Sequence, residues 1–276
     1  MKFAICNELF EGWPFAQVCQ YVKSVGYDGL EVAPFTLAPR ITAVNAARRH
    51  DLRRQAEDAG VEIIGLHWLL AATEGFHLTS PDADERSRTA DYLVALAEAT
   101  RDFGGRVMVL GSPKQRSLPP NVTWDEGFAH ACDVLRRAMP AIGEAGVSLC
   151  LEPLTPAETD FINTAAEGAR LVQAVGHPNC VLHLDVKAMS SEPTPVPDII
   201  RQFIRQTGHF HANDPNRLGP GMGDVDFVPI FDALGAGGYQ GWVSVEVFDY
   251  SPGVEAIATQ SIEYMKRCLT TVMEGR

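Results

Sequence analysis

Four polar residues end four consecutive apolar runs in the second half of the chain: Glu152, Asp185, His211 and Glu246. If the runs are neighbouring strands, three carboxylates converge, and burying each one costs several kcal/mol unless it is paired or binds a cation. One such carboxylate alone is often a helix cap or an ion-pair partner, so the prediction depends on all four together. Three carboxylates and one imidazole form a mainly oxygen-donor set, which predicts one divalent metal ion per chain.

The chemistry that such a site favours is proton transfer at a carbon next to a carbonyl. Loss of that proton gives an enediolate, whose charge a divalent cation can neutralise as a Lewis acid. Two carboxylates on opposite faces of the carbon can remove and return the proton, which inverts the centre. We predict Glu152 and Glu246 as this catalytic pair, each also a metal ligand, because the fifth and eighth strands lie across a barrel mouth from one another.

The elements that would position these residues alternate regularly. Eight apolar runs, continuous as in parallel strands covered by helices, are expected as strands: Lys2–Cys6, Gly29–Ala33, Glu62–His67, Arg106–Leu110, Ser148–Glu152, Val181–Asp185, His209–Ala212 and Trp242–Val247. Amphipathic helices are expected between them: Trp13–Val25, Asn45–Ala59, Asp84–Phe103, two that begin after capping boxes at Thr123 and Thr164, Pro197–Thr207, Val228–Leu234 and Val254–Leu269.

This alternation predicts an α/β fold, a single (β/α)8 TIM barrel that forms one domain over residues 1–276. The length suits a barrel of about 250 residues, and a glycine such as Gly26 or Gly208 stands at each of the seven helix-to-strand returns, where it can cap the helix. The alternative is an open doubly wound sheet. That fold would need a glycine-rich turn after the first strand, and Cys6–Pro14 contains only Gly12.

Composition excludes several classes of protein. The net charge of −12 argues against nucleic acid as a partner. No apolar run is long enough to cross a membrane and the first residues do not resemble a signal peptide, so a cytoplasmic protein is expected. The six cysteines form no C-x-x-C pair, which excludes zinc-ribbon and thioredoxin sites. Cys150 and Cys180 lie in apolar strand-like runs and are predicted to be small buried hydrophobic residues.

The segment His209–Arg217, HFHANDPNR, followed by Gly219–Asp226, GPGMGDVD, resembles the strand-seven and loop segment of the ketose 3-epimerases. These enzymes act on tagatose, psicose and fructose and belong to the xylose-isomerase-like barrel superfamily. The resemblance implies that the four residues named above hold Mn²⁺ or Co²⁺, with Mg²⁺ or Zn²⁺ as alternatives. It also implies a small sugar as substrate, contacts from Glu158 and Arg217 to the substrate oxygens, and a homo-oligomer, either a dimer or a tetramer.

One position departs from the ketose 3-epimerase pattern. These enzymes carry a histidine three residues after the metal-binding aspartate, where this chain has Ala188. We predict Lys187 as a substrate-binding residue that could supply the missing donor. His67 is also predicted to bind substrate, although packing against Trp68 is an equal alternative. His183 and His209 are predicted to be core histidines, because each precedes a predicted ligand by two residues on the same strand face.

The segment Gly111–Ser117 after the fourth predicted strand places Lys114 and Arg116 near the barrel mouth. Solvated loop charges are one interpretation, and a clamp for a substrate carboxylate, phosphate or larger glycoside is the other. Aromatic residues near the predicted strand ends could form an apolar wall against a sugar or pack in the core: Trp13, Phe35, Trp68, Phe248 and Tyr250.

The sequence therefore predicts a metal-dependent sugar epimerase or isomerase of the ketose 3-epimerase type. A first alternative keeps the barrel and metal but acts on keto-glycosides or inososes as an epimerase, lyase or dehydratase. A second alternative is a sugar-binding barrel without catalysis. An endonuclease IV-type function is not expected, because the extra histidine ligands of that fold are missing and the chain is acidic.

Overall fold

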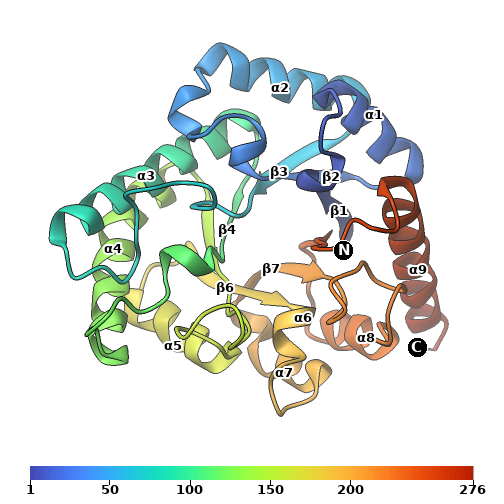
Figure 1. Cartoon of the computed structure of the whole chain (residues 1–276). Helices are drawn as coiled ribbons and strands as arrows, with labels where there is room; N and C mark the ends of the chain where they lie inside the picture. The colour runs from blue at the N-terminus through green and yellow to red at the C-terminus, as the bar shows by residue number, and fades with distance from the viewer. Residues whose placement is uncertain (276) are drawn as a thin grey trace.

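The computed structural model describes residues 1–275 and shows eight parallel strands closed into a barrel, with helices around the outside (Figure 1). This confirms the predicted α/β barrel. The strands are β1 Lys2–Cys6, β2 Gly29–Val32, β3 Glu62–Leu66, β4 Val107–Leu110, β5 Ser148–Leu151, β6 Cys180–Asp185, β7 Thr207–Ala212 and β8 Trp242–Val245. The assignment of residues 1–276 to one domain remains a prediction.

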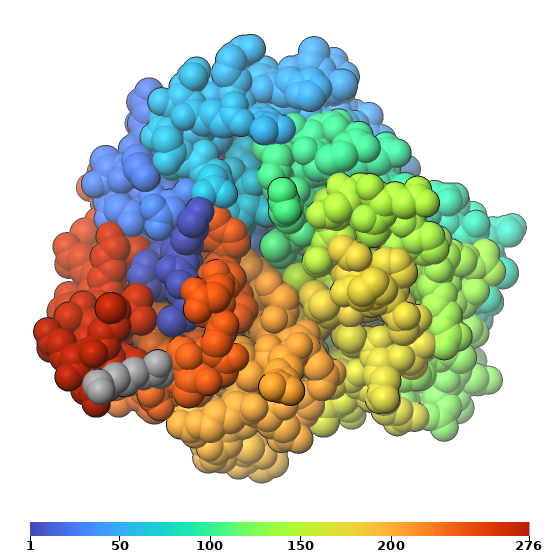
Figure 2. Space-filling model, turned by 180° about the vertical axis from the view of Figure 1, so that it is seen from behind, coloured from blue at the N-terminus to red at the C-terminus, as the bar shows by residue number. Residues whose placement is uncertain are grey.

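The barrel closes where the first strand pairs with the last. Phe3 aligns with Val243 and Ile5 with Val245, so residues from the two ends of the sequence share one ladder. The space-filling view from behind shows the same closure, with the blue N-terminal segment next to the orange and red C-terminal part (Figure 2). The ends of all strands therefore meet at a common mouth.

The helices largely follow the predicted ranges. Their bounds are α1 Phe15–Val25, α2 Ala46–Ala59, α3 Ala83–Phe103, α4 Trp124–Glu144, α5 Ala165–Val175, α6 Val186–Met189, α7 Val196–Phe203, α8 Val228–Ala236 and α9 Val254–Glu274. Both capping boxes are present. At the start of α4, the Thr123 hydroxyl accepts from Glu126 N–H, and the Glu126 carboxylate accepts from Thr123 N–H over 2.8 Å. The local sequence thus determines where these helices begin.

Gly208 does not cap a helix as predicted. It lies within β7, and a Cβ at this position would collide with the Val181 side chain on the neighbouring strand β6. Its role is close packing between strands. The helix before it, α7, ends at Phe203 and continues as a short 3-10 turn, Ile204–Gln206.

The apolar core lies mainly between the strands and the surrounding helices. Each strand supplies fully buried residues to it, among them Ile5, Leu30, Leu66 and Leu149, while helix α3 supplies Leu93. All six cysteines are free and buried, which confirms the prediction made for Cys150 and Cys180. Within residues 1–275, no helix combines the length and apolar character needed to span a bilayer.

Candidate active site

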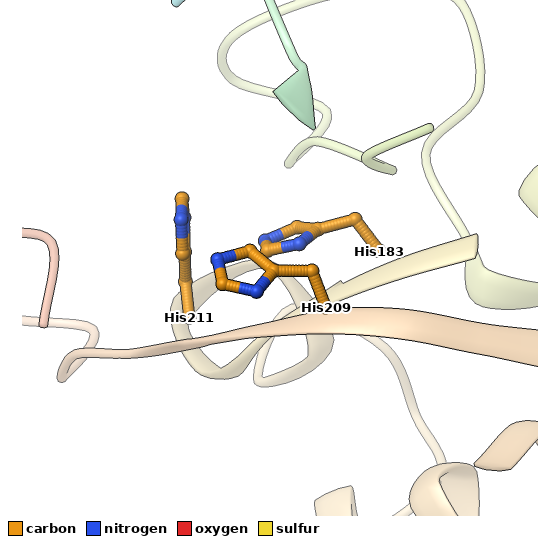
Figure 3. Close-up of side chains that lie close together, drawn as sticks. All are labelled: His183, His209 and His211. Atoms are coloured by element: carbon orange, nitrogen blue, oxygen red, sulfur yellow. The ribbon is translucent and has the colours of Figure 1, made fainter. Parts of the chain in front are cut away.

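The structure brings three of the four predicted metal ligands together. Nitrogen or oxygen atoms of Glu152, His183, Asp185 and His211 all lie within 4.8 Å of one another, and all four residues are buried. They come from the ends of β5, β6 and β7. His183, predicted to be a core residue, is fully buried, and neither of its ring nitrogens has a hydrogen-bond partner among residues 1–275. Figure 3 shows its ring beside those of His209 and His211.

Glu246, the fourth predicted ligand, borders this cluster through His211. Its Oε2 lies 3.0 Å from Nδ1 of His211, and its Oε1 accepts a 2.6 Å hydrogen bond from the indole N–H of Trp68. Both oxygens of Glu246 are thus held by ring nitrogens, and its side chain is almost fully buried. Glu246 follows β8, so the four predicted ligands come from four neighbouring strands.

Three buried carboxylates influence one another in and beside this cluster. Burial raises the pKa of Glu152 well above its ordinary value, and the nearby carboxylates of Glu246 and Asp185 raise it further. Burial also raises the pKa of Asp185, although the Lys187 ammonium opposes that shift. A divalent cation would relieve this crowding. The oxygen-rich donor set therefore fits the predicted metal ion.

Backbone and amide groups orient Asp185. Its Oδ1 accepts the N–H of Ala188 over 2.7 Å, and its Oδ2 accepts from the Asn213 side-chain amide over 2.6 Å. Asn213 in turn accepts from the backbone N–H of Lys187. The Ala188 position thus contributes a backbone donor to Asp185, and its buried methyl group offers no hydrogen bond to a ligand.

Sequence reasoning missed Glu31, a fully buried carboxylate on β2. Its Oε2 lies 2.8 Å from Nε2 of His209 and 3.2 Å from Nε2 of His211. Burial alone would raise the pKa of Glu31, but the two histidines outweigh it and hold that pKa well below its ordinary value. A lone acidic residue inside an apolar run was the available signal. Glu31 gives His211 a carboxylate partner on the ring nitrogen opposite Glu246.

His67 is also paired with a carboxylate that sequence reasoning missed. Its Nε2 lies 2.8 Å from Oε2 of Glu8, and both side chains are buried. The ring is fully enclosed and does not line the cavity described below. Glu8 and the barrel core enclose the ring, and a contact between His67 and substrate stays a prediction.

A cavity of about 360 Å³ opens beside the cluster and provides room for a small ligand. Its lining includes Trp68, Glu152, Glu158, Arg217, Glu246 and Phe248. Trp68 and Phe248 stack with ring centres 6.1 Å apart, and Phe35 lies 5.8 Å from Trp68. Trp68 and Phe248 thus form an aromatic wall of this cavity, one of the two alternatives predicted for them, whereas Phe35 packs against Trp68 without lining the cavity.

The predicted substrate-binding residues cluster at the edge of this cavity. The Lys187 ammonium lies 2.6 Å from Oε1 of Glu158 and 4.6 Å from the centre of the Phe248 ring. Arg217 donates to the backbone carbonyl of Phe248 over 3.0 Å. Glu158 and Arg217 line both this cavity and an adjoining groove, which Lys187 also lines. Three of the four predicted substrate-binding residues thus lie together.

Arg116 is neither a solvated charge nor a substrate clamp. Its side chain is fully buried, and its guanidinium donates to the backbone carbonyls of Glu152 over 2.5 Å and Ile162 over 2.9 Å. Burial lowers the pKa of Arg116 to about 10, which leaves it charged at neutral pH. The residue therefore anchors the loop after β5 at the position of a predicted metal ligand. The backbone of Gly111 also packs closely against Glu152, because a Cβ at Gly111 would collide with Oε2 of Glu152.

Comparison with models of known protein families identifies the family of this chain. Residues 19–268 match the xylose isomerase-like TIM barrel family, so the chain belongs to this family.

Among curated proteins, the chain is 33% identical to an L-ribulose 3-epimerase of Mesorhizobium japonicum over 62% of this chain and 58% of the relative. It is 29% identical to a D-psicose 3-epimerase of Ruminiclostridium cellulolyticum over 82% of this chain and 76% of the relative. The structure of a D-psicose 3-epimerase with D-tagatose from Clostridium cellulolyticum H10 has the same fold. Its TM-score is 0.88 at 23% identity, with 98% of this chain and 99% of that chain covered. The similarity to ketose 3-epimerases that the motif indicated is thus confirmed.

Proposed function

We propose that this protein is a divalent-metal-dependent epimerase that inverts a ketose carbon next to the carbonyl. One observation carries the proposal: Glu152 and Glu246 both line a single cavity beside a buried cluster of further oxygen and nitrogen donors. The named relatives are 3-epimerases of ketoses, which supports the same class of reaction.

The metal would be held by Glu152, Asp185, His211 and Glu246. Mn²⁺ is the proposed ion, and Co²⁺, Mg²⁺ and Zn²⁺ are alternatives for the same donor set. When bound, a divalent ion supplies Lewis-acid stabilisation of the charge that develops as the carbon loses its proton.

The chain's own residues would move the proton. Glu152 and Glu246 belong to different strands and face the same cavity, so one carboxylate can take a proton from one side of the carbon. The other can return a proton to the opposite side, which inverts the centre. Trp68 fixes the Glu246 carboxylate, and Arg116 fixes the backbone at Glu152. These contacts would hold the acid–base pair in place.

Glu158, Arg217 and Lys187 would orient the sugar. Lys187 neutralises Glu158, so this pair can both donate to and accept from hydroxyl groups. The aromatic side chains of Trp68 and Phe248, which line the cavity, would cover an apolar face of the sugar and limit access of water. The proposal includes a cytoplasmic location and a homo-oligomer, dimer or tetramer, with a small-molecule sugar as the ligand.

The test is incorporation of solvent deuterium into a ketose panel after loading with Mn²⁺ or Co²⁺. Fructose, psicose, tagatose and ribulose are incubated in D₂O, and mass spectrometry and chromatography follow label and product. About one metal per chain with label at the inverted carbon and no loss of water is expected. Loss of water would instead indicate a dehydratase. Bound metal without label in any ketose or keto-glycoside would leave a sugar-binding barrel, and absence of metal binding would contradict the proposal.

A further inference from the structure

One cation in the active-site cavity has no role in the proposed reaction. Lys114 lines the same cavity as Glu152 and Glu246. Its side chain is exposed, and among residues 1–275 its ammonium has no ion-pair or hydrogen-bond partner. By contrast, the Lys187 ammonium at the edge of the cavity is paired with Glu158 over 2.6 Å. Lys114 therefore presents an uncompensated positive charge to whatever occupies the cavity.

The turn that carries Lys114 is held firmly on both sides. Before it, Ser112 is buried in a left-handed conformation, φ +49°, and its hydroxyl accepts the N–H of Leu70 over 3.1 Å. After it, the carbonyl of Gln115 accepts the N–H of Leu78 over 2.7 Å. A left-handed serine is uncommon and indicates that surrounding contacts determine the backbone. Lys114 is thus the exposed residue of an anchored turn rather than part of a loose loop.

The anchor also ties Lys114 to the reaction centre. Arg116, two residues further on, binds the backbone carbonyl of Glu152. The distance between the turn and the proposed metal ligand is therefore set by a buried guanidinium. A group that Lys114 contacts would lie at a defined distance from the reacting carbon.

The remaining charges at the mouth leave the cavity edge positive. Arg217 lines it; its guanidinium donates to the neutral carbonyl of Phe248 and interacts with the carboxylate of Asp249. The Glu158 carboxylate is already neutralised by Lys187. Glu152 and Glu246 are assigned to the metal. Among residues 1–275, Lys114 thus remains the cation of this cavity edge without a counter-charge, and an anionic ligand would supply the missing charge.

We propose that the substrate is an anionic ketose, whose carboxylate or phosphate group, remote from the reacting carbons, is held by Lys114. This inference rests on the proposed epimerase function and narrows its substrate class. An ammonium on a flexible stem serves as a point charge with three donors, and it suits either a uronate carboxylate or a phosphate monoester. Arg217 adds to the attraction while it contacts the sugar oxygens.

The experiment compares three ketoses that differ at the terminal carbon: D-fructose, D-fructuronate and D-fructose 6-phosphate. Deuterium incorporation by the Mn²⁺-loaded full chain gives kcat/KM for each, and calorimetry on the same protein gives the binding constants. We expect one anionic ketose to exceed fructose at least about tenfold in kcat/KM. The carboxylate and phosphate compounds separate the two sources of negative charge. The preference should weaken at high salt, because the lysine is exposed.

Substitutions of Lys114 test whether this residue causes the preference for an anionic ketose. Lys114→Gln should reduce the preference for the anionic ketose by about tenfold, and Lys114→Arg should keep most of it. Lys23→Gln, an exposed lysine on α1 outside the cavity, is the matched control and should leave the preference unchanged.

Three results separate the two proposals. Equal kcat/KM for fructose and both anionic ketoses, or an unchanged preference in Lys114→Gln, would overturn the anion site while the epimerase stands. Tighter binding of an anionic ketose without deuterium incorporation would overturn the epimerase and keep the anion site. Equal binding of all three sugars without incorporation would overturn both.

Discussion

The indole N–H of Trp68 donates to Oε1 of Glu246 over 2.6 Å, so a residue that follows β3 holds a carboxylate that follows β8. Trp68 has a left-handed backbone, φ +51°, which is rare for a bulky residue and costs of order 1–3 kcal/mol. Its ring also stacks on Phe248. Stacking and the hydrogen bond together hold this conformation.

Trp68→Phe should remove the hydrogen bond while it keeps an aromatic ring against Phe248. We expect kcat to fall about tenfold, since one charge-assisted hydrogen bond is lost, with a smaller change in KM. Steady-state kinetics on the best ketose measures the effect. Phe35→Leu, which removes a ring contact to Trp68 but no hydrogen bond, is the control. Equal kcat in Trp68→Phe and the unaltered protein would show that Glu246 does not need this donor.

Glu246→Gln should abolish turnover while sugar binding remains mostly intact. The amide is similar in shape but cannot act as a base, and general acid–base groups contribute about 10²–10⁴-fold to rate. Deuterium incorporation and calorimetry on the same protein separate the two effects. The exposed Glu98→Gln on α3 serves as the control. Near-normal turnover in Glu246→Gln would refute the catalytic assignment.

Glu31→Gln should weaken metal binding about 10–100-fold, because a carboxylate partner fixes the ring orientation of a ligating histidine. Titration calorimetry with Mn²⁺, or the visible spectrum of the Co²⁺ form, gives the affinity without reference to activity. Glu62→Gln is the control, since the exposed Glu62 pairs with Lys2 at the start of β3, away from the proposed ligands. An unchanged affinity in Glu31→Gln would mean that His211 is held by other contacts.

The cysteine thiols should report on opening of the fold. Burial raises the pKa of Cys19 and of Cys180 to about 12 in each case. Because the folded state keeps these thiols protonated, their contribution to stability is present below about pH 8.5 and is lost as the pH rises toward 12.

Near pH 8, native thiols should therefore react slowly with a disulfide reagent, and all six should react in denaturant. Mn²⁺ at about 100 times its Kd should slow the native reaction, because ligand binding adds about 2.7 kcal/mol of stability. Equal rates with and without Mn²⁺ would argue against a metal site in the folded protein.

The barrel and most of the site could be predicted because the sequence patterns that indicate them involve residues close together in the chain. Apolar runs mark the strands, capping boxes mark α4 and α5, and the polar residues that end the last four runs mark the mouth of a barrel. Glu152, Asp185 and His211 meet because parallel strands align those ends. The register shift between Leu182 and His183 opposite β7 could not be predicted, because it depends on strand pairing.

The sequence could not predict which charged residues are satisfied by distant parts of the chain. From the local sequence, Arg116 resembles a surface charge. Its partners in the fold are backbone carbonyls that lie 36 and 46 residues further along the chain. His67 similarly depends on Glu8, 59 residues earlier. These contacts are long-range, and no local pattern distinguishes a buried guanidinium or imidazole from an exposed one.

The closure of β1 on β8 has a consequence for how the molecule divides into halves. The proposed ligands all come from β5 to β8, whereas Glu31 and Trp68, which hold two of them, come from the first half. A fragment with the second half alone would carry every ligand but lack the partners that orient His211 and Glu246. Two fragments, divided at the turn before β5 and co-expressed, should therefore bind the metal only when they associate. Metal binding would then measure directly whether the two half-barrels assemble.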